Sequence, residues 1–223
     1  MPNENFRQAN RSHTSILATA EKKTLIGIAA RLPRWVNSDH LTALGFLALV
    51  AAGACYYAAS STPQALLWVI PCLILNWFGD SLDGTLARVR NQKRPRYGFY
   101  LDHILDAIGT FFLISGLAFS GYMSPAVAYA FLIAYLLLSI EIYLATYTIG
   151  TFHLSYWSFG PTELRILLII GNLFALRNPW AHAGSYRFLL FDAGFAIGTV
   201  GVTLILIQAV VRHTKMLYTE EKI

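Results

Sequence analysis

Long apolar runs are the feature that most limits what this chain can fold into. They recur along most of its 223 residues, and the links between them are brief and carry helix-breaking residues. A helix needs roughly 20 apolar residues to cross a bilayer core about 30 Å thick. Uninterrupted runs of this length in lipid indicate helices, because a helix satisfies its own backbone hydrogen bonds. We expect six membrane-spanning helices, near residues 40–60, 64–90, 98–120, 125–150, 162–176 and 188–211.

Composition agrees with a membrane protein. Only 13% of the residues are charged, whereas a soluble domain has about 25%. The two cysteines, Cys55 and Cys72, lie inside apolar runs and are expected to be small core residues. The predicted fold class is therefore an all-α integral membrane protein with six transmembrane helices, of which the fifth is the shortest.

The segment 15–32 mixes lysine and arginine with leucine and isoleucine and is too polar to span a membrane. We predict an amphipathic helix on the cytosolic interface, with a solvated arm as the alternative. The chain then divides into an N-terminal arm (1–38), a six-helix domain (39–212) and a cytosolic tail (213–223).

Lysine and arginine are concentrated in segments that would face one side of the membrane. These segments precede the first span, join the second to the third, and follow the last. The opposite side offers only Arg177 and Arg187. The positive-inside rule predicts that both termini are cytosolic. This distribution also accounts for the sequence pI of about 9.3, so we expect no nucleic-acid partner.

Four aspartates fall within the second and third predicted spans. A charged side chain at membrane depth costs roughly 2.5–3.5 kcal/mol on insertion scales, so these residues need compensating partners. One face of the first helix carries, within an arc of about 100°, Asp80, Asp83, Gly84 and Ala87. One face of the next helix carries, within about 80°, Gly98, Asp102 and Asp106. An antiparallel pair joined by the short loop 91–97 would bring both faces together near the cytosolic surface, where the carboxylates need cations.

The ligand types favour a hard divalent cation. Aspartate oxygens without nearby cysteine suit Mg²⁺, Mn²⁺ or Ca²⁺, and paired ions held by carboxylates serve in-line attack at phosphorus. Gly84 and Ala87 leave room for a ligand, and Arg88 can hold a phosphate. Two alternatives remain open on this reasoning. One is a proton or cation pathway, and the other is structural pairing of the carboxylates with Arg88, Arg90 and Arg165.

These residues form a pattern that resembles the signature of the CDP-alcohol phosphatidyltransferases. The pattern reads Asp80-x2-Asp83-Gly84-x2-Ala87-Arg88-x9-Gly98-x3-Asp102-x3-Asp106. The gap of nine residues between Arg88 and Gly98 is one longer than the usual form, so no role is carried over to the arginines of that loop.

The resemblance implies a reaction and a set of ligands. A hydroxyl attacks the β-phosphorus of a CDP-linked donor, and CMP leaves. The four aspartates would hold two divalent cations, Mg²⁺ or Mn²⁺, with Ca²⁺ as a bound but non-productive ion. The nucleotide and diphosphate would lie against Asp80, Asp83, Gly84, Ala87 and Arg88. Members of the family are commonly homodimers, and this bacterial-type pattern implies the bacterial inner membrane.

The general base that the resemblance implies is Asp106. His103 is the rival, because imidazole titrates near neutral pH. Helical geometry turns His103 about 60° from Asp106 and about 100° from Asp102, away from the aspartate face, which favours Asp106.

Four residues outside the signature are further candidates. Asp39, in a stretch similar to the family's first-span opening, would bind the nucleotide, unless it and Ser38 only cap the helix. Glu163, Arg165 and Glu141, together with His103, are candidates for the acceptor site; otherwise they are pairing partners inside the membrane.

The predicted function is metal-dependent transfer from a CDP-linked donor to an alcohol in phospholipid biosynthesis. The preferred donor is CDP-diacylglycerol. A CDP-alcohol acting on a lipid hydroxyl such as that of diacylglycerol is the alternative. A cation or proton transporter is the alternative from another class.

Overall fold

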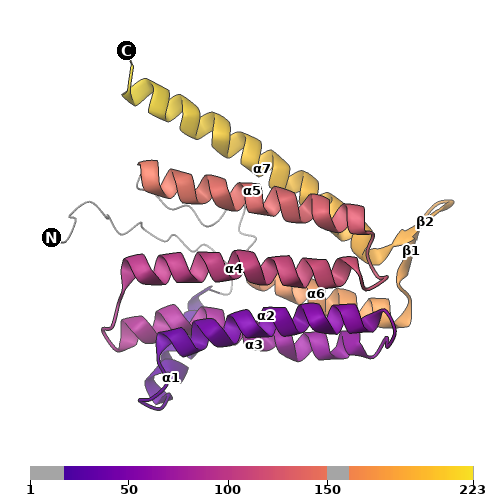
Figure 1. The fold of residues 1–223 in the computed structure, drawn as a ribbon, viewed down its shortest axis with the longest axis horizontal. Helices are drawn as coiled ribbons and strands as arrows, with labels where there is room; N and C mark the ends of the chain where they lie inside the picture. Colours follow the sequence, from indigo (N-terminus) through magenta and orange to yellow (C-terminus); the bar gives the residue numbers. More distant parts are fainter. Residues whose placement is uncertain (1–17, 150–160, 223) are drawn as a thin grey trace.

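The computed structural model describes residues 18–149 and 161–222. Within these ranges it contains helices and one short β-hairpin (Figure 1). The elements are α1 (Ala18–Arg31), α2 (Ser38–Ala59), α3 (Ala65–Val89), α4 (Pro95–Ala118), α5 (Pro125–Ile149), α6 (Pro161–Arg177), β1 (Trp180–Ala183), β2 (Tyr186–Leu189) and α7 (Leu190–Glu220).

The long helices lie side by side in a layered bundle. Figure 1 shows α4 between the α2–α3 pair and α5, with α7 on the far side of α5 and tilted away from it at its C-terminal end. The short helix α6 packs mainly on α3. Successive long helices are antiparallel because the links between them are short, so residues distant in sequence meet at the same membrane depth.

Five helices are long and apolar enough to cross a membrane: α2, α3, α4, α5 and α7. The chain is therefore a multi-pass integral membrane protein, as predicted. The helix α6 has 17 residues, fewer than the roughly 20 needed to cross, so a sixth span stays a prediction. The last helix, predicted to end near residue 211, continues to Glu220 and includes most of the expected tail.

The hairpin between α6 and α7 was not predicted. Its strands pair in antiparallel register from Trp180 opposite Leu189 to Ala183 opposite Tyr186. Gly184, with φ of +59°, allows the reversal that an L side chain would resist. The guanidinium of Arg187 lies 4.1 Å from the centre of the Trp180 ring. The segment is too short and too mixed for a sequence pattern to distinguish it from an irregular link.

A helix forms in the predicted amphipathic segment. Within α1, Leu25 and Ala29 are buried against Leu82 and Leu86 of α3. The connection to α2 is held by Arg90, whose Nη2 donates to the carbonyl oxygens of Leu32 and Pro33, both at 2.9 Å. The placement of α1 on the membrane interface stays a prediction. Its expected first residues, 15–17, lie outside the described part of the chain.

Glycines bring α2 unusually close to both of its neighbours. A Cβ added at Gly79 of α3 would lie 2.5 Å from the carbonyl oxygen of Leu41. A Cβ added at Gly116 of α4 would lie 2.0 Å from the carbonyl oxygen of Gly53. Both distances are impossible for a real side chain, so α2 meets α3 and α4 by backbone contact. Small residues have this use in membrane helices, where close approach strengthens packing.

We predict that Gly116→Ala destabilises the protein, because α4 must move away from α2. The expected cost is about 1–3 kcal/mol, as for other overpacked interiors. Thermal unfolding of the purified protein in detergent measures it as a lower Tm. Gly194→Ala on α7 is the matched control, because a Cβ there meets nothing within 4 Å. An unchanged Tm in Gly116→Ala would contradict the close contact.

Candidate active site

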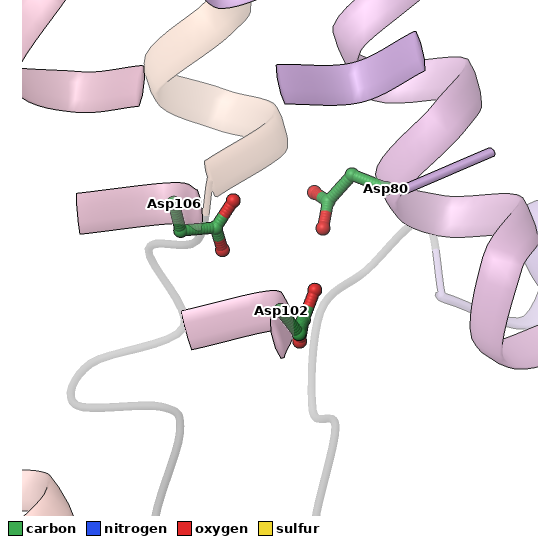
Figure 2. A group of neighbouring side chains, drawn as sticks. All are labelled: Asp80, Asp102 and Asp106. Atoms are coloured by element: carbon green, nitrogen blue, oxygen red, sulfur yellow. The ribbon is translucent and has the colours of Figure 1, made fainter. Parts of the chain in front are cut away.

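Three of the four predicted aspartates converge between α3 and α4. Asp80, Asp102 and Asp106, here called the aspartate triad, each offer one carboxylate oxygen, and these oxygens lie within 4.8 Å of one another. Figure 2 shows the three side chains pointing toward a common centre. All three are partly exposed. The prediction that the two helix faces meet is therefore confirmed for these residues.

The α3–α4 link explains the convergence. The helix α3 ends at Val89, and Asn91 takes a left-handed backbone conformation with φ of 54°, which reverses the chain within a few residues. Proline at the first position of α4 suits a helix start, because no backbone N–H is needed there. Asp102 and Asp106 are four residues apart, so they share one face of α4.

Asp83 is oriented differently from the triad. Its side chain is buried, and its Oδ2 accepts a hydrogen bond of 2.6 Å from Thr42 Oγ1 of α2. Ser38 Oγ donates to the Asp83 backbone carbonyl oxygen at 2.9 Å. Three residues along a helix rotate a side chain by about 300°, a net offset of about 60°, so Asp83 stays on the same broad face as Asp80 while its Oδ2 reaches Thr42 of α2. Within the described ranges three carboxylates form the close group, and Asp83 has one oxygen bound to α2, so a site made of all four carboxylates stays a prediction.

Arg165 reaches the triad from α6. Its Nη2 donates to Asp80 Oδ2 at 2.6 Å, and its Nε donates to Asn76 Oδ1 at 2.7 Å. The predicted acceptor-site arginine therefore contacts an aspartate of the triad directly. Glu163, its neighbour in the first turn of α6, is partly buried.

The other two arginines considered as pairing partners bind neighbouring oxygens among their contacts. Arg90 binds the backbone carbonyls before α2. Arg88 is exposed on the surface, and its Nη2 donates to Thr85 Oγ1 at 2.9 Å. A Cβ added at Gly84 would lie 3.5 Å from Arg88 Nη1, so the guanidinium lies across that glycine. Ala87 is also partly exposed, and a Cβ added at Gly98 meets nothing within 4 Å.

His103 packs between two aromatic rings. Its ring centre lies 4.1 Å from that of Phe99 and 5.1 Å from that of Tyr143. Its Nδ1 is 2.7 Å from the Phe99 carbonyl oxygen and 3.7 Å from Asp102 Oδ2. A carbonyl oxygen only accepts, so Nδ1 carries the proton in this bond. Nε2 is then the nitrogen that can accept a proton from elsewhere.

The start of α2 differs from the expected cap. Asn37 caps the helix, since its side chain accepts from the His40 backbone N–H at 3.0 Å and the His40 ring accepts from the Asn37 N–H. The interpretation of Ser38 and Asp39 as cap residues was wrong by one or two positions, because Asn37 fills the same role. Asp39 instead forms an ion pair with Arg94 of the α3–α4 link.

Glu141 faces α7. Its Oε1 lies 2.5 Å from His213 Nδ1, and both side chains are largely buried. An acceptor role for Glu141 stays a prediction, and the observed contact supports the alternative of pairing inside the membrane. His213 was missed because the last span was expected to end before it.

Three further residues that bind site residues were not predicted: Thr42, Ser38 and Asn76. Asn76 had a usable signal, because an amide in an apolar run four residues before Asp80 shares its helix face. No sequence signal predicts the contacts of Thr42 and Ser38 with Asp83, because these contacts depend on how α2 is rotated against α3.

A group of carboxylates and an arginine lies inside a multi-pass helical bundle, and such a group could hold a metal ion. The model of one family, CDP-alcohol phosphatidyltransferase, matches residues 35–212 of the chain. The chain belongs to this family. A comparison with curated proteins found no significant match.

Membership makes the chain an enzyme, a transferase of substituted phosphate groups that uses a CDP-alcohol and an alcohol acceptor. The family is divalent-metal dependent in general and fits membrane phospholipid biosynthesis. The matched segment contains the whole signature, all four aspartates and Arg165. This result favours the transferase over the ion-transport alternative.

We predict that Thr42→Val lowers the rate of CMP release by about tenfold, because valine keeps the shape of threonine but cannot donate to Asp83. Loss of a hydrogen bond that orients a metal ligand typically costs about 10–100-fold, and Asp83 is a predicted ligand. Thr42→Ser, which keeps the hydroxyl, is the matched control and should stay close to wild type. Equal rates in the valine and serine variants would show that the bond to Asp83 has no role in turnover.

Proposed function

We propose that the enzyme transfers a phosphatidyl group from CDP-diacylglycerol to the hydroxyl of a small polar alcohol and releases CMP. The observation that carries this proposal is the meeting of Asp80, Asp102 and Asp106 inside a chain of this family. Three carboxylates within 4.8 Å at partial exposure are costly without a cationic ligand. A nucleoside diphosphate with its divalent cations supplies one.

The donor set fits divalent cations. A group made of carboxylate oxygens alone suits Mg²⁺ or Mn²⁺. We assign two such ions to Asp80, Asp83, Asp102 and Asp106, with Ca²⁺ able to bind without supporting turnover. When bound, the metals neutralise the diphosphate and the departing CMP.

The nucleotide side of the site lies toward the cytosolic ends of α2 and α3. Gly84 and Ala87 carry no bulky side chain on the α3 surface, and the Arg88 guanidinium, which lies across Gly84, is placed to meet the diphosphate. Asp39 is the candidate contact for the ribose or cytosine. Asp39 lies in the first turn of α2 and pairs with Arg94, which directly precedes α4.

The chemical step needs one proton acceptor. The acceptor hydroxyl oxygen forms a bond to the β-phosphorus, the bond between that phosphorus and the CMP oxygen breaks, and the hydroxyl proton passes to Asp106. Asp106 is preferred to His103, because Asp106 belongs to the aspartate triad, whereas the histidine ring is packed between Phe99 and Tyr143.

The acceptor enters beside α6 in this proposal. Arg165 and Glu163 lie in its first turns, with His103 and Glu141 as further candidates on α4 and α5. Arg165 brings positive charge to the triad, but its guanidinium already binds Asp80. An acceptor with its own phosphate needs more positive charge, so we favour an uncharged or zwitterionic alcohol.

The setting proposed for the reaction is the cytosolic side of the bacterial inner membrane. The basic segments before the first and after the second span support a cytosolic location for both termini. We also propose that the enzyme acts as a homodimer.

The reaction itself is tested with purified protein in lipid and Mg²⁺ or Mn²⁺. CMP formation is measured with CDP-diacylglycerol and a panel of small alcohols. We expect CMP only when donor, acceptor and metal are all present. CMP formed from a soluble CDP-alcohol and diacylglycerol would reverse the assignment of donor and acceptor. No CMP under any combination would refute the proposal.

Asp106→Asn tests the general base. We predict a loss of turnover of at least about 100-fold, the usual contribution of a positioned base. Binding of CDP-diacylglycerol should largely survive, because asparagine keeps the shape of the side chain. Asp192→Asn is the matched control. Asp192 lies at the start of α7 and binds Ser124, which directly precedes α5, away from the triad. Normal turnover in Asp106→Asn would exclude this base and direct attention to His103.

A further inference from the structure

We infer that Asn76 is a positioning residue for the metal site: it holds Arg165, and Arg165 in turn orients Asp80. The inference rests on the proposed role of Asp80 as a metal ligand. Asn76 is not part of the signature motif, and its side chain is one helical turn from Asp80.

Both ends of the Asn76 amide are used. The residue is buried, with 1% of its surface exposed. Its Oδ1 accepts from Arg165 Nε at 2.7 Å, and its Nδ2 donates to the Gly45 carbonyl oxygen at 3.0 Å. Arginine only donates and a carbonyl only accepts, so one orientation of the amide satisfies both neighbours. The Asn76 side chain is therefore locked.

The close approach of α2 and α3 makes this lock possible. A Cβ added at Gly45 would lie 3.4 Å from the Asp80 backbone nitrogen and 3.7 Å from Asn76 Nδ2. The α2 backbone thus lies directly against the α3 segment that carries both residues. A longer separation would leave the Gly45 carbonyl out of reach of a side chain as short as asparagine.

Arg165 binds two side chains on one face of α3. Asn76 and Asp80 are four residues apart and lie one above the other. The planar guanidinium directs Nε to Asn76 and Nη2 to Asp80, and the arginine side chain is 14% exposed. Such a rigid fork fixes the direction of its partners in a way that the single ammonium of lysine does not.

Arg165 orients Asp80 by binding one of its two carboxylate oxygens. Arg165 binds Oδ2, and this bond fixes the plane of the carboxylate and with it the direction of Oδ1. Residues that orient a metal ligand through hydrogen bonds typically change metal affinity or activity by about 10–100-fold when removed. Asn76 does so through Arg165, without touching substrate or metal.

Mn²⁺ binding tests the inference without relying on turnover. Purified wild type and variants in lipid nanodiscs are titrated with Mn²⁺, and the free ion is followed by electron paramagnetic resonance. We expect Asn76→Ala to weaken Mn²⁺ binding at least about tenfold. Arg165→Lys should weaken it similarly, because lysine keeps the charge but loses the fork. In turnover, both should raise the Mn²⁺ concentration needed for half-maximal rate more than they lower kcat.

Asn172→Ala is the matched control. Asn172 is also fully buried and also bonds across helices, from α6 to Tyr56 of α2 at 3.0 Å. We expect it to lower Tm while leaving Mn²⁺ affinity close to that of wild type, which separates positioning from general loss of stability.

Two results would overturn the inference: wild-type Mn²⁺ affinity in Arg165→Lys, or in a folded Asn76→Ala. If Asn76→Ala does not fold, Arg165→Lys decides alone, since it leaves the contact between α2 and α3 untouched. Failure of wild type to bind Mn²⁺ would overturn it as well. Wild type that binds Mn²⁺ with these variant effects, but forms no CMP, would refute the proposed reaction and leave the positioning role standing.

Discussion

The cost of keeping negative charge inside a bilayer is the constraint on which the rest of this structure depends. Three carboxylates that lie within 4.8 Å of one another repel in a medium that screens poorly. Arg165 offsets part of that repulsion through its contact with Asp80. Divalent cations and a diphosphate would offset the remainder. The charges that make the helices α3 and α4 difficult to bury are thus the charges that give the site its proposed chemistry.

The helix α3 is supported on both sides by polar contacts to other elements. On the α2 side, Thr42 and Ser38 bind Asp83. On the α6 side, Arg165 binds Asp80 and Asn76. Two of the four signature aspartates are therefore each held by a separate helix. This division explains why the short helix α6 matters to the site even though its packing is limited mostly to α3.

The sequence predicts features that depend on neighbouring residues better than features that depend on contacts between distant segments. Apolar length located five helices that can span the membrane, and i, i+4 spacing placed Asp102 and Asp106 on one face. Those are local properties. The rotation of α2, which brings Thr42 to Asp83, and the docking of α6 depend on packing between distant segments. The cap at Asn37 was missed because several neighbouring polar residues suited the position equally well.

Backbone contact through glycine has a consequence for how the enzyme responds to its lipid surroundings. Helices respond to a thicker or thinner bilayer by tilting, and those with few internal contacts tilt at least cost. The helix α7 is of this kind, because it packs chiefly on α5 and few of its residues are buried. At Gly79 and Gly116 no side chains separate α2 from α3 and α4. The spacing of these three helices is therefore set by backbone atoms. Changes in membrane thickness should therefore be absorbed at the periphery, and the distances within the triad should stay nearly constant across membranes of different composition.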